Sequence, residues 1–274
     1  MIREQLSGTR IAITGSTGFL GTALVERLLR AVPDCELVLL VRPGRRGAQR
    51  RIDRDILCND AFDRMRAECA DGDETFEQMT ARRVHAIAGD VSTDGLGVDD
   101  DGLALLATCD LAIHSAAAVS FDSALDDAVE INLLGPSRVA DGLRAAAAVR
   151  TEPTPGGLAP GEPAHLVAVS TCYVAGSRRG KAPEELVDES PFFVDVDWRV
   201  EVDNARRARI DNEQASRTPE RLAALRKEAY ADLGPAGSPA IAEKVEQLRA
   251  KWVGQQMTDS GRARASSLGF PDAY

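Results

Sequence analysis

Residues 10–21 read RIAITGSTGFLG, and this stretch decides the fold. A short apolar run at residues 11–14 leads directly into glycines at positions 15, 18 and 21. The segment that follows, TALVERLLRAV, carries apolar residues at the spacing of one helix face. A strand, a glycine turn and a helix in this order are typical of a dinucleotide-binding βα unit.

The three glycines have different predicted tasks. Gly15 lets the chain turn sharply out of the strand, Gly18 leaves room for a pyrophosphate, and Gly21 lets the helix pack closely on the sheet. The helix N-terminus presents unpaired N–H groups to the phosphates. A turn that only packs a helix on a strand would need neither three glycines at this spacing nor the polar residues beside them. The predicted cofactor contacts in the turn are Gly15, Ser16, Thr17, Gly18, Phe19, Leu20 and Gly21.

The end of the second expected strand, residues 36–41, indicates which dinucleotide is bound. Sites for NAD place an acidic residue near this point, whereas an arginine suits the 2′-phosphate of NADP. Arg42 occupies it, and a charge-assisted contact of this kind is worth about 1.5–3 kcal/mol. The sequence therefore predicts NADP(H) as the cofactor. The later arginines of this segment are expected to be a solvated helix start.

Further strands are expected at residues 82–91, 109–119 and 164–170, alternating with helical segments. One of these helices is expected over residues 124–149, with a kink at its Gly-Pro pair, positions 135 and 136. Repeated βα units predict an α/β fold with a Rossmann-type, doubly wound parallel sheet. Ligands of such sheets bind at the carboxyl ends of the strands. The cofactor contacts predicted at these ends are Asp90 and Val91, Ala116 and Ala117, and Ser170.

Composition narrows the class of protein. The 274 residues carry 33 basic and 43 acidic side chains, and this net charge of −10 does not favour nucleic acid or anionic lipid. No apolar run is long enough to span a membrane, and the N-terminus lacks a signal-peptide pattern. The five cysteines form no CxxC pair and the three histidines lack zinc spacing, so no metal is expected. These features predict a cytoplasmic protein.

The pattern changes after residue 176. Residues 178–264 are charged and read as largely helical, with a break at residues 234–239. The expected organisation is an NADP-binding Rossmann domain over residues 1–177, a helical insertion over 178–264, and a return segment over 265–274. The insertion is either part of a substrate cover or a solvent-exposed helical hairpin.

Taken together, these motifs resemble the fatty acyl-CoA reductase family, bacterial type, among the extended short-chain dehydrogenases/reductases. The resemblance covers nearly the whole chain, although Pro136 stands where the family often has threonine. The motifs that carry it are TGSTGFLG, the strand ending in VRP, GDV, HSAAAVSF, INLLG and VSTCYVAG.

The resemblance implies a set of catalytic residues. Thr171 would supply a hydroxyl, Tyr274 the acid of the family's YxxxK motif, and Asn132 would support their network. Strand-end hydrogen bonding is the alternative role for Thr171, and a buried helix amide the alternative for Asn132. The motif's lysine would lie four residues beyond Tyr274, where the chain stops. The chain is therefore expected to be a fragment that lacks the family's C-terminal substrate region and reduces acyl-CoA negligibly.

Three functions follow from the residues and the resemblance. The first is NADPH-dependent reduction of a fatty acyl-CoA to the aldehyde, or to the alcohol by a second hydride. The second is a related reductase acting on carrier-protein thioesters, or an extended reductase acting on a nucleotide sugar. The third is a cofactor-binding module without turnover.

Overall fold

The computed structural model describes residues 2–70, 72–171, 175–177, 179–191, 193–234 and 237–271. The chain forms two compact units. The first consists of Met1–Ala117 and Glu130–Ser170, and the second of Ala118–Val129 and Thr171–Tyr274. The domain boundaries expected at residues 177 and 264 remain predictions.

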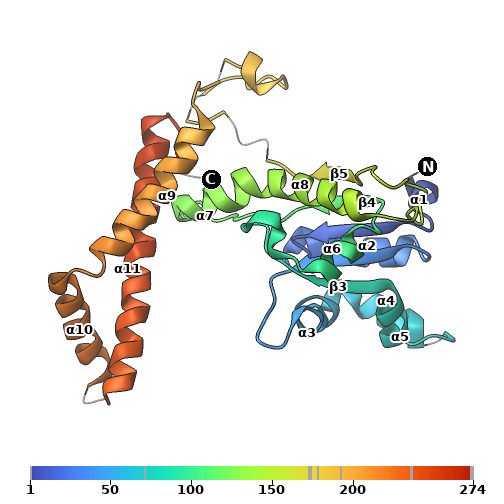
Figure 1. Ribbon diagram of the computed structural model, residues 1–274, viewed down its shortest axis with the longest axis horizontal. Coiled ribbons are helices and arrows are strands. Elements are labelled where there is room, and N and C mark those ends of the chain that lie inside the picture. The colour runs from blue at the N-terminus through green and yellow to red at the C-terminus, as the bar shows by residue number, and fades with distance from the viewer. Residues whose placement is uncertain are drawn as a thin grey trace. The chain divides into compact units, whose positions relative to one another are not determined.

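The first unit is built on a five-stranded parallel sheet in the order β3-β2-β1-β4-β5 (Figure 1). From β1 the chain moves outward to β3 and then returns to the other side of β1, which places a topological switch point between β1 and β4. This order confirms the predicted doubly wound Rossmann-type sheet. The strands are β1 (Arg10–Thr14), β2 (Glu36–Val41), β3 (Val84–Ala88), β4 (Leu111–His114) and β5 (His165–Ala168).

Three of the expected strands are shorter than predicted. The third was expected to begin at residue 82, but Arg82 and Arg83 close the preceding helix, α5 (Phe76–Arg83). That helix has its own start signal, a capping box between Thr75 and Gln78, and it ends only at Arg83, directly before the apolar run. β4 and β5 likewise pair over four residues each, so the small and polar residues after them form loops instead of strand.

Two apolar clusters lie on opposite faces of the sheet. Ile11 and Ile13 of β1 belong to one cluster, while Ala12 between them belongs to the other, as the two-residue period of a strand requires. The first face is covered by α2 (Phe19–Ala31), α3 (Ala48–Ile52), α4 (Asp63–Ala70) and α5. The second is covered by α6 (Asp100–Leu106) and α8 (Leu134–Val149). The short elements of this unit are α1 (Ile2–Gln5), η1 (Asp53–Leu57), η2 (Asp60–Phe62) and η3 (Asp94–Gly97).

The helix expected over residues 124–149 is three elements. α7 (Leu125–Asp127) precedes a π-helical turn, η4 (Ala128–Leu133), and α8 follows. The kink expected at Gly135 and Pro136 is therefore wrong in position, because the irregular turn lies just before them. Pro136 falls in the first turn of α8, where its missing N–H would have no intrahelical partner, so the helix tolerates it.

The second unit is largely helical, as the charge pattern predicted. Its long helices are α9 (Trp198–Ala215), α10 (Pro219–Leu233) and α11 (Ser238–Ser267), with a short η5 (Val187–Glu189) before them. The expected break occurs at Gly234, which ends α10 with a φ of +62°. A small apolar core forms between α10 and α11 from Leu222, Leu225, Ala229, Ile241, Val245 and Leu248. In the part of the chain that the structure describes, no helix combines the length and apolarity needed to cross a bilayer.

Candidate cofactor site

The glycine turn lies at the switch point, where β1 and β4 end side by side. Gly15 has a φ of +75°, and a Cβ there would stand 2.5 Å from the backbone N of Ala116. Both facts exclude a larger residue. The backbone N–H and Oγ of Ser115 donate to the carbonyl of Thr14 at 3.2 and 2.9 Å. The turn is therefore packed on the end of β4, the segment where Ala116 and the exposed Ala117 were predicted to meet the cofactor.

Gly21 and Gly18 differ in what surrounds them. A Cβ on Gly21 would stand 2.1 Å from the carbonyl oxygen of Gly15, so the helix can pack on the turn only with glycine here. A Cβ on Gly18 would meet only that same oxygen, at 3.3 Å. The protein thus leaves the space beside Gly18 open, as close approach of a phosphate requires.

The start of α2 offers donors to such a phosphate. The first N–H groups of a helix have no intrahelical acceptor. No side chain hydrogen-bonds to this end of the helix. The Phe19 side chain is 97% exposed, so the groups that α2 offers to a phosphate here are its backbone N–H groups. Ser16 is fully buried, and its Oγ has no partner among the described residues. These features fit a dinucleotide pyrophosphate.

A buried histidine supports the turn. His114 at the end of β4 lies 2.7 Å by its Nδ1 from the Oγ1 of Thr14, which is its partner in the sheet register. Burial lowers the pKa of His114, so the imidazole is neutral at pH 7. Sequence analysis missed this pair. The pattern that could have predicted it is a polar residue, Thr14 or His114, at the last position of each of two neighbouring apolar strands.

Arg42 lies where the prediction placed it, directly after β2, and its side chain is exposed. No acidic side chain of the described chain pairs with its guanidinium. Nη1 of Arg51 donates to the Arg42 carbonyl at 2.7 Å, which fixes the backbone at this point. The structure therefore presents an available cation at the end of β2, as a 2′-phosphate would need.

The predicted adenine contacts lie in a closed loop after β3. Oδ1 of Asp90 accepts hydrogen bonds from the N–H and Oγ of Ser92, at 2.9 and 2.7 Å. The backbone N–H of Asp90 donates to the carbonyl of Leu96 at 2.8 Å, and Val91 is buried. Leu96 has a φ of +60°, which costs about 1–2 kcal/mol for a residue with a Cβ. That strain is offset by a side chain that is 1% exposed in the core.

The predicted catalytic residues are distributed over both units. Asn132 is half-buried in η4, and Ser170 follows β5 as the last residue of the first unit. Thr171 is exposed and begins the second of the two segments that form the second unit. Tyr274 lies outside the described residues. In the first unit the glycine turn, the end of β4 and the loop after β3 all lie at the carboxyl ends of parallel strands, while the roles of the other residues remain predictions.

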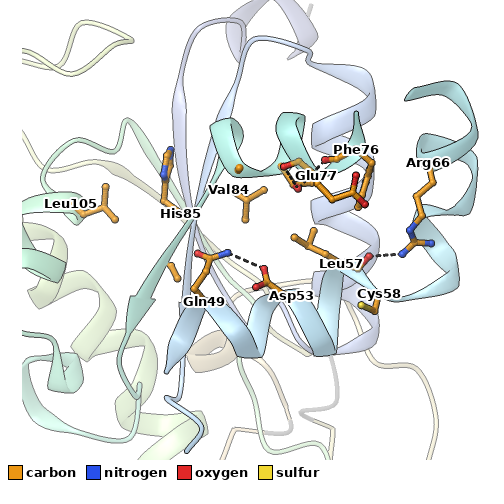
Figure 2. Close-up of a pocket in the computed structure, with 13 residues that line it drawn as sticks. Gln49, Asp53, Leu57, Cys58, Arg66, Phe76, Glu77, Val84, His85 and Leu105 are labelled. Atoms are coloured by element: carbon orange, nitrogen blue, oxygen red, sulfur yellow. Dashed lines mark hydrogen bonds between the residues drawn. The ribbon is translucent and has the colours of Figure 1, made fainter. Parts of the chain in front are cut away.

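A cavity of about 750 Å³ lies elsewhere, along the edge strand β3. Figure 2 shows His85 and Leu105 at one end of it, Phe76 and Glu77 from α5 above, and Gln49 and Asp53 from α3 and η1 below. It contacts the amino-terminal half of β3, and none of the predicted site residues lines it. Because ligands of open α/β sheets bind at the carboxyl ends, the switch point is the better candidate. Among the described residues, no three His, Cys, Asp or Glu side chains cluster as metal ligands would.

Comparison with known proteins identifies the family. Residues 13–274 match the model of an NAD-binding domain family described as male sterility protein. The chain belongs to this family. It is 28% identical over 223 residues to probable fatty acyl-CoA reductase 5 of Arabidopsis thaliana, covering 78% of this chain and 42% of that protein. It is 27% identical over 275 residues to probable fatty acyl-CoA reductase 4 of the same plant, covering 99% and 47%.

These relatives confirm the resemblance that the motifs indicated, and the chain spans less than half of their length. Among solved structures, the terminal R domain of the myxalamid PKS-NRPS pathway is 25% identical, with a TM-score of 0.45, over 73% of this chain and 44% of that one. The family match supports a nicotinamide cofactor. The open space at Gly18, the start of α2 and Arg42 are the features of this chain that fit it.

Proposed function

We propose that this protein is an NADPH-dependent reductase of fatty acyl thioesters, with fatty acyl-CoA as its substrate class. The observation that carries the proposal is the family match over residues 13–274, with relatives named fatty acyl-CoA reductases. Reduction of such a thioester consumes one hydride and one proton, and releases the thiol and an aldehyde.

The choice of NADPH over NADH rests on Arg42. Its guanidinium is exposed and pairs with no acid of the described chain. The bond from Arg51 to the Arg42 carbonyl holds the backbone in place after β2. A 2′-phosphate is a dianion for which this cation is the matching partner, whereas an acid here would repel it. The hydroxyl of an NADH ribose makes no comparable contact.

When bound, the dinucleotide supplies the hydride. The residues of this chain must then stabilise charge on the thioester carbonyl oxygen, which requires donors already directed at it. We assign this task to the hydroxyls of Thr171 and Tyr274, with Tyr274 donating the proton. Asn132 supports them from η4, and Ala116, Ala117 and Ser170 border the dinucleotide.

A binding experiment tests the cofactor assignment. We expect calorimetry on the 274-residue chain to give a lower Kd for NADPH than for NADH. The change Arg42→Ala should weaken NADPH binding about 10- to 100-fold, the equivalent of a charge-assisted bond, and leave NADH unchanged. Arg144→Ala, at an exposed arginine of α8, is the matched control. Equal affinities for the two dinucleotides in the wild type would contradict the assignment.

A turnover experiment tests the reaction. Acyl-CoAs of graded chain length are incubated with NADPH and a longer version of the protein in which the chain continues past Tyr274, and NADPH oxidation is compared with thiol release. The proposal expects the two to rise together and Thr171→Val to reduce both. Tight NADPH binding without thiol release would instead support a cofactor-binding module.

A further inference from the structure

One face of α8 packs on the loop that carries Asp90. Gly135, Arg138 and Gly142 lie at i, i+3 and i+7, which places them on the same side of the helix. A Cβ on Gly142 would stand 2.6 Å from Cδ1 of Leu96, and one on Gly135 would lie 3.6 Å from Cγ2 of Val91. Small residues at both positions thus let the helix contact the loop closely.

Arg138 lies between these two glycines and contacts the same loop. Its Nε donates to Oδ1 of Asp94 at 2.8 Å. The side chain of Arg138 is only 11% exposed, whereas that of Asp94 is 92% exposed. Since an ion pair with an exposed carboxylate contributes little, this contact is the weaker part of the arrangement.

The other two nitrogens of Arg138 point to the π-helical turn η4. Nη2 donates to Oε2 of Glu130 at 2.6 Å, and Nη1 donates to the Glu130 carbonyl at 2.9 Å. The Glu130 carboxylate is 23% exposed, so this pair is better shielded from water than the one with Asp94. Glu130 precedes Asn132 by two residues in the same turn.

π-Helical turns are rare and occur frequently at functional sites, because their backbone departs from the regular hydrogen-bond pattern. Here one guanidinium bonds both the side chain and the carbonyl of Glu130, in the planar geometry that arginine provides and lysine does not.

We propose that Arg138 is a positioning residue of the cofactor site, which holds the turn that carries Asn132 on the face of α8 that packs against the loop that carries Asp90. In this arrangement one face of α8 supports both the loop assigned to the base of the dinucleotide and the turn assigned to its reacting end. The inference rests on the proposed function, since it assigns Asp90 to the base and Asn132 to the reacting end.

The test compares Arg138→Met with Arg144→Met, which changes an exposed arginine of the same helix. Hydrogen exchange is first measured without ligand. The proposal expects the amides of residues 130–133 to exchange at least about tenfold faster in Arg138→Met and at the wild-type rate in Arg144→Met. Arg138→Lys, which keeps the charge but not the two-pronged contact, should fall between them. Asp94→Asn should change exchange by less than about twofold, given the exposure of that carboxylate.

NADPH affinity is the second readout. Arg138→Met should bind NADPH several-fold more weakly, and Arg144→Met normally. Wild-type exchange at residues 130–133 in folded Arg138→Met, or in Arg138→Lys should the methionine variant not fold, would overturn the inference, as would unchanged NADPH affinity. A wild type that binds no NADPH would overturn the proposed function instead, while the exchange data would still decide whether Arg138 holds the turn.

Discussion

At the scale of single residues, the three glycines of one motif differ in how strictly the folded chain requires them. Gly15 and Gly21 are fixed by the protein itself, because a Cβ at either would collide with backbone atoms at 2.5 or 2.1 Å. Gly18 has an ordinary φ of −84°, and a Cβ there would meet only the carbonyl oxygen of Gly15, at 3.3 Å, so a side chain requires a smaller adjustment here than at the other two positions. A pyrophosphate close to this backbone would be a further reason for glycine.

This difference predicts distinct effects for two substitutions. Gly21→Ala should destabilise the fold by about 1–3 kcal/mol or more, because the helix must move away from the turn. Gly18→Val should lower the melting temperature less than Gly21→Ala does and abolish NADPH binding, since the branched side chain fills the space for the pyrophosphate. Thermal unfolding and calorimetry on both variants test this. A folded Gly18→Val protein that binds NADPH normally would show that the loop is only structural.

At the scale of elements, α2 shows how a helix end can depend on a distant side chain. Arg83, at the end of α5, is 3% exposed and pairs with no carboxylate among the described residues. It donates instead to the carbonyls of Leu29, Val32 and Cys35, at 2.7, 2.6 and 2.9 Å. These carbonyls belong to the last turn of α2 and the loop after it, where the regular helical hydrogen bonds end. The Val32 carbonyl also accepts from the N–H of Cys35 at 3.2 Å.

Removing this arginine should therefore be costly. Arg83→Met takes the guanidinium donors away from three carbonyls, and a buried carbonyl left unsatisfied costs about 1–3 kcal/mol, so we expect a loss of roughly 3–5 kcal/mol in the free energy of unfolding. Arg82→Met, its exposed neighbour that pairs with Glu74, should change stability by less than about 0.5 kcal/mol. Urea unfolding of the two variants makes the comparison. Similar losses in both would mean that Arg83 does not support the end of α2.

The same elements show what could be predicted from the sequence. The glycine turn and the five strands were found because apolar runs and glycine spacing are local signals. Arg83 was assigned to a strand because the apolar run after it concealed the end of α5. His114 and Arg138 were missed because their partners lie 100 residues away or in an irregular turn that no spacing rule describes. Thr171 and Tyr274 came from the resemblance alone, and their roles stay predictions.

At the scale of the whole molecule, charge is distributed unevenly. The chain has a net charge of −10, yet the segment after β2 contains Arg42, Arg45, Arg46 and Arg50, all exposed and unpaired with acids of the described residues. An acidic protein repels a dinucleotide phosphate at long range. A local arginine cluster beside the expected 2′-phosphate reverses that field at short range.

This arrangement predicts a different salt dependence for the two dinucleotides. Raising ionic strength from about 0.1 M to about 1 M shortens the screening length from about 10 Å to about 3 Å. NADPH carries the additional phosphate, so its affinity should fall more steeply with salt than that of NADH. The double change Arg45→Ala and Arg46→Ala should flatten the NADPH dependence while keeping the Arg42 contact. Calorimetric titrations over this range, with Arg144→Ala as the control for a lost surface charge, provide the measurement. Parallel salt dependences for NADPH and NADH in the wild type would show that neither the cluster nor Arg42 makes an ionic contact with the 2′-phosphate.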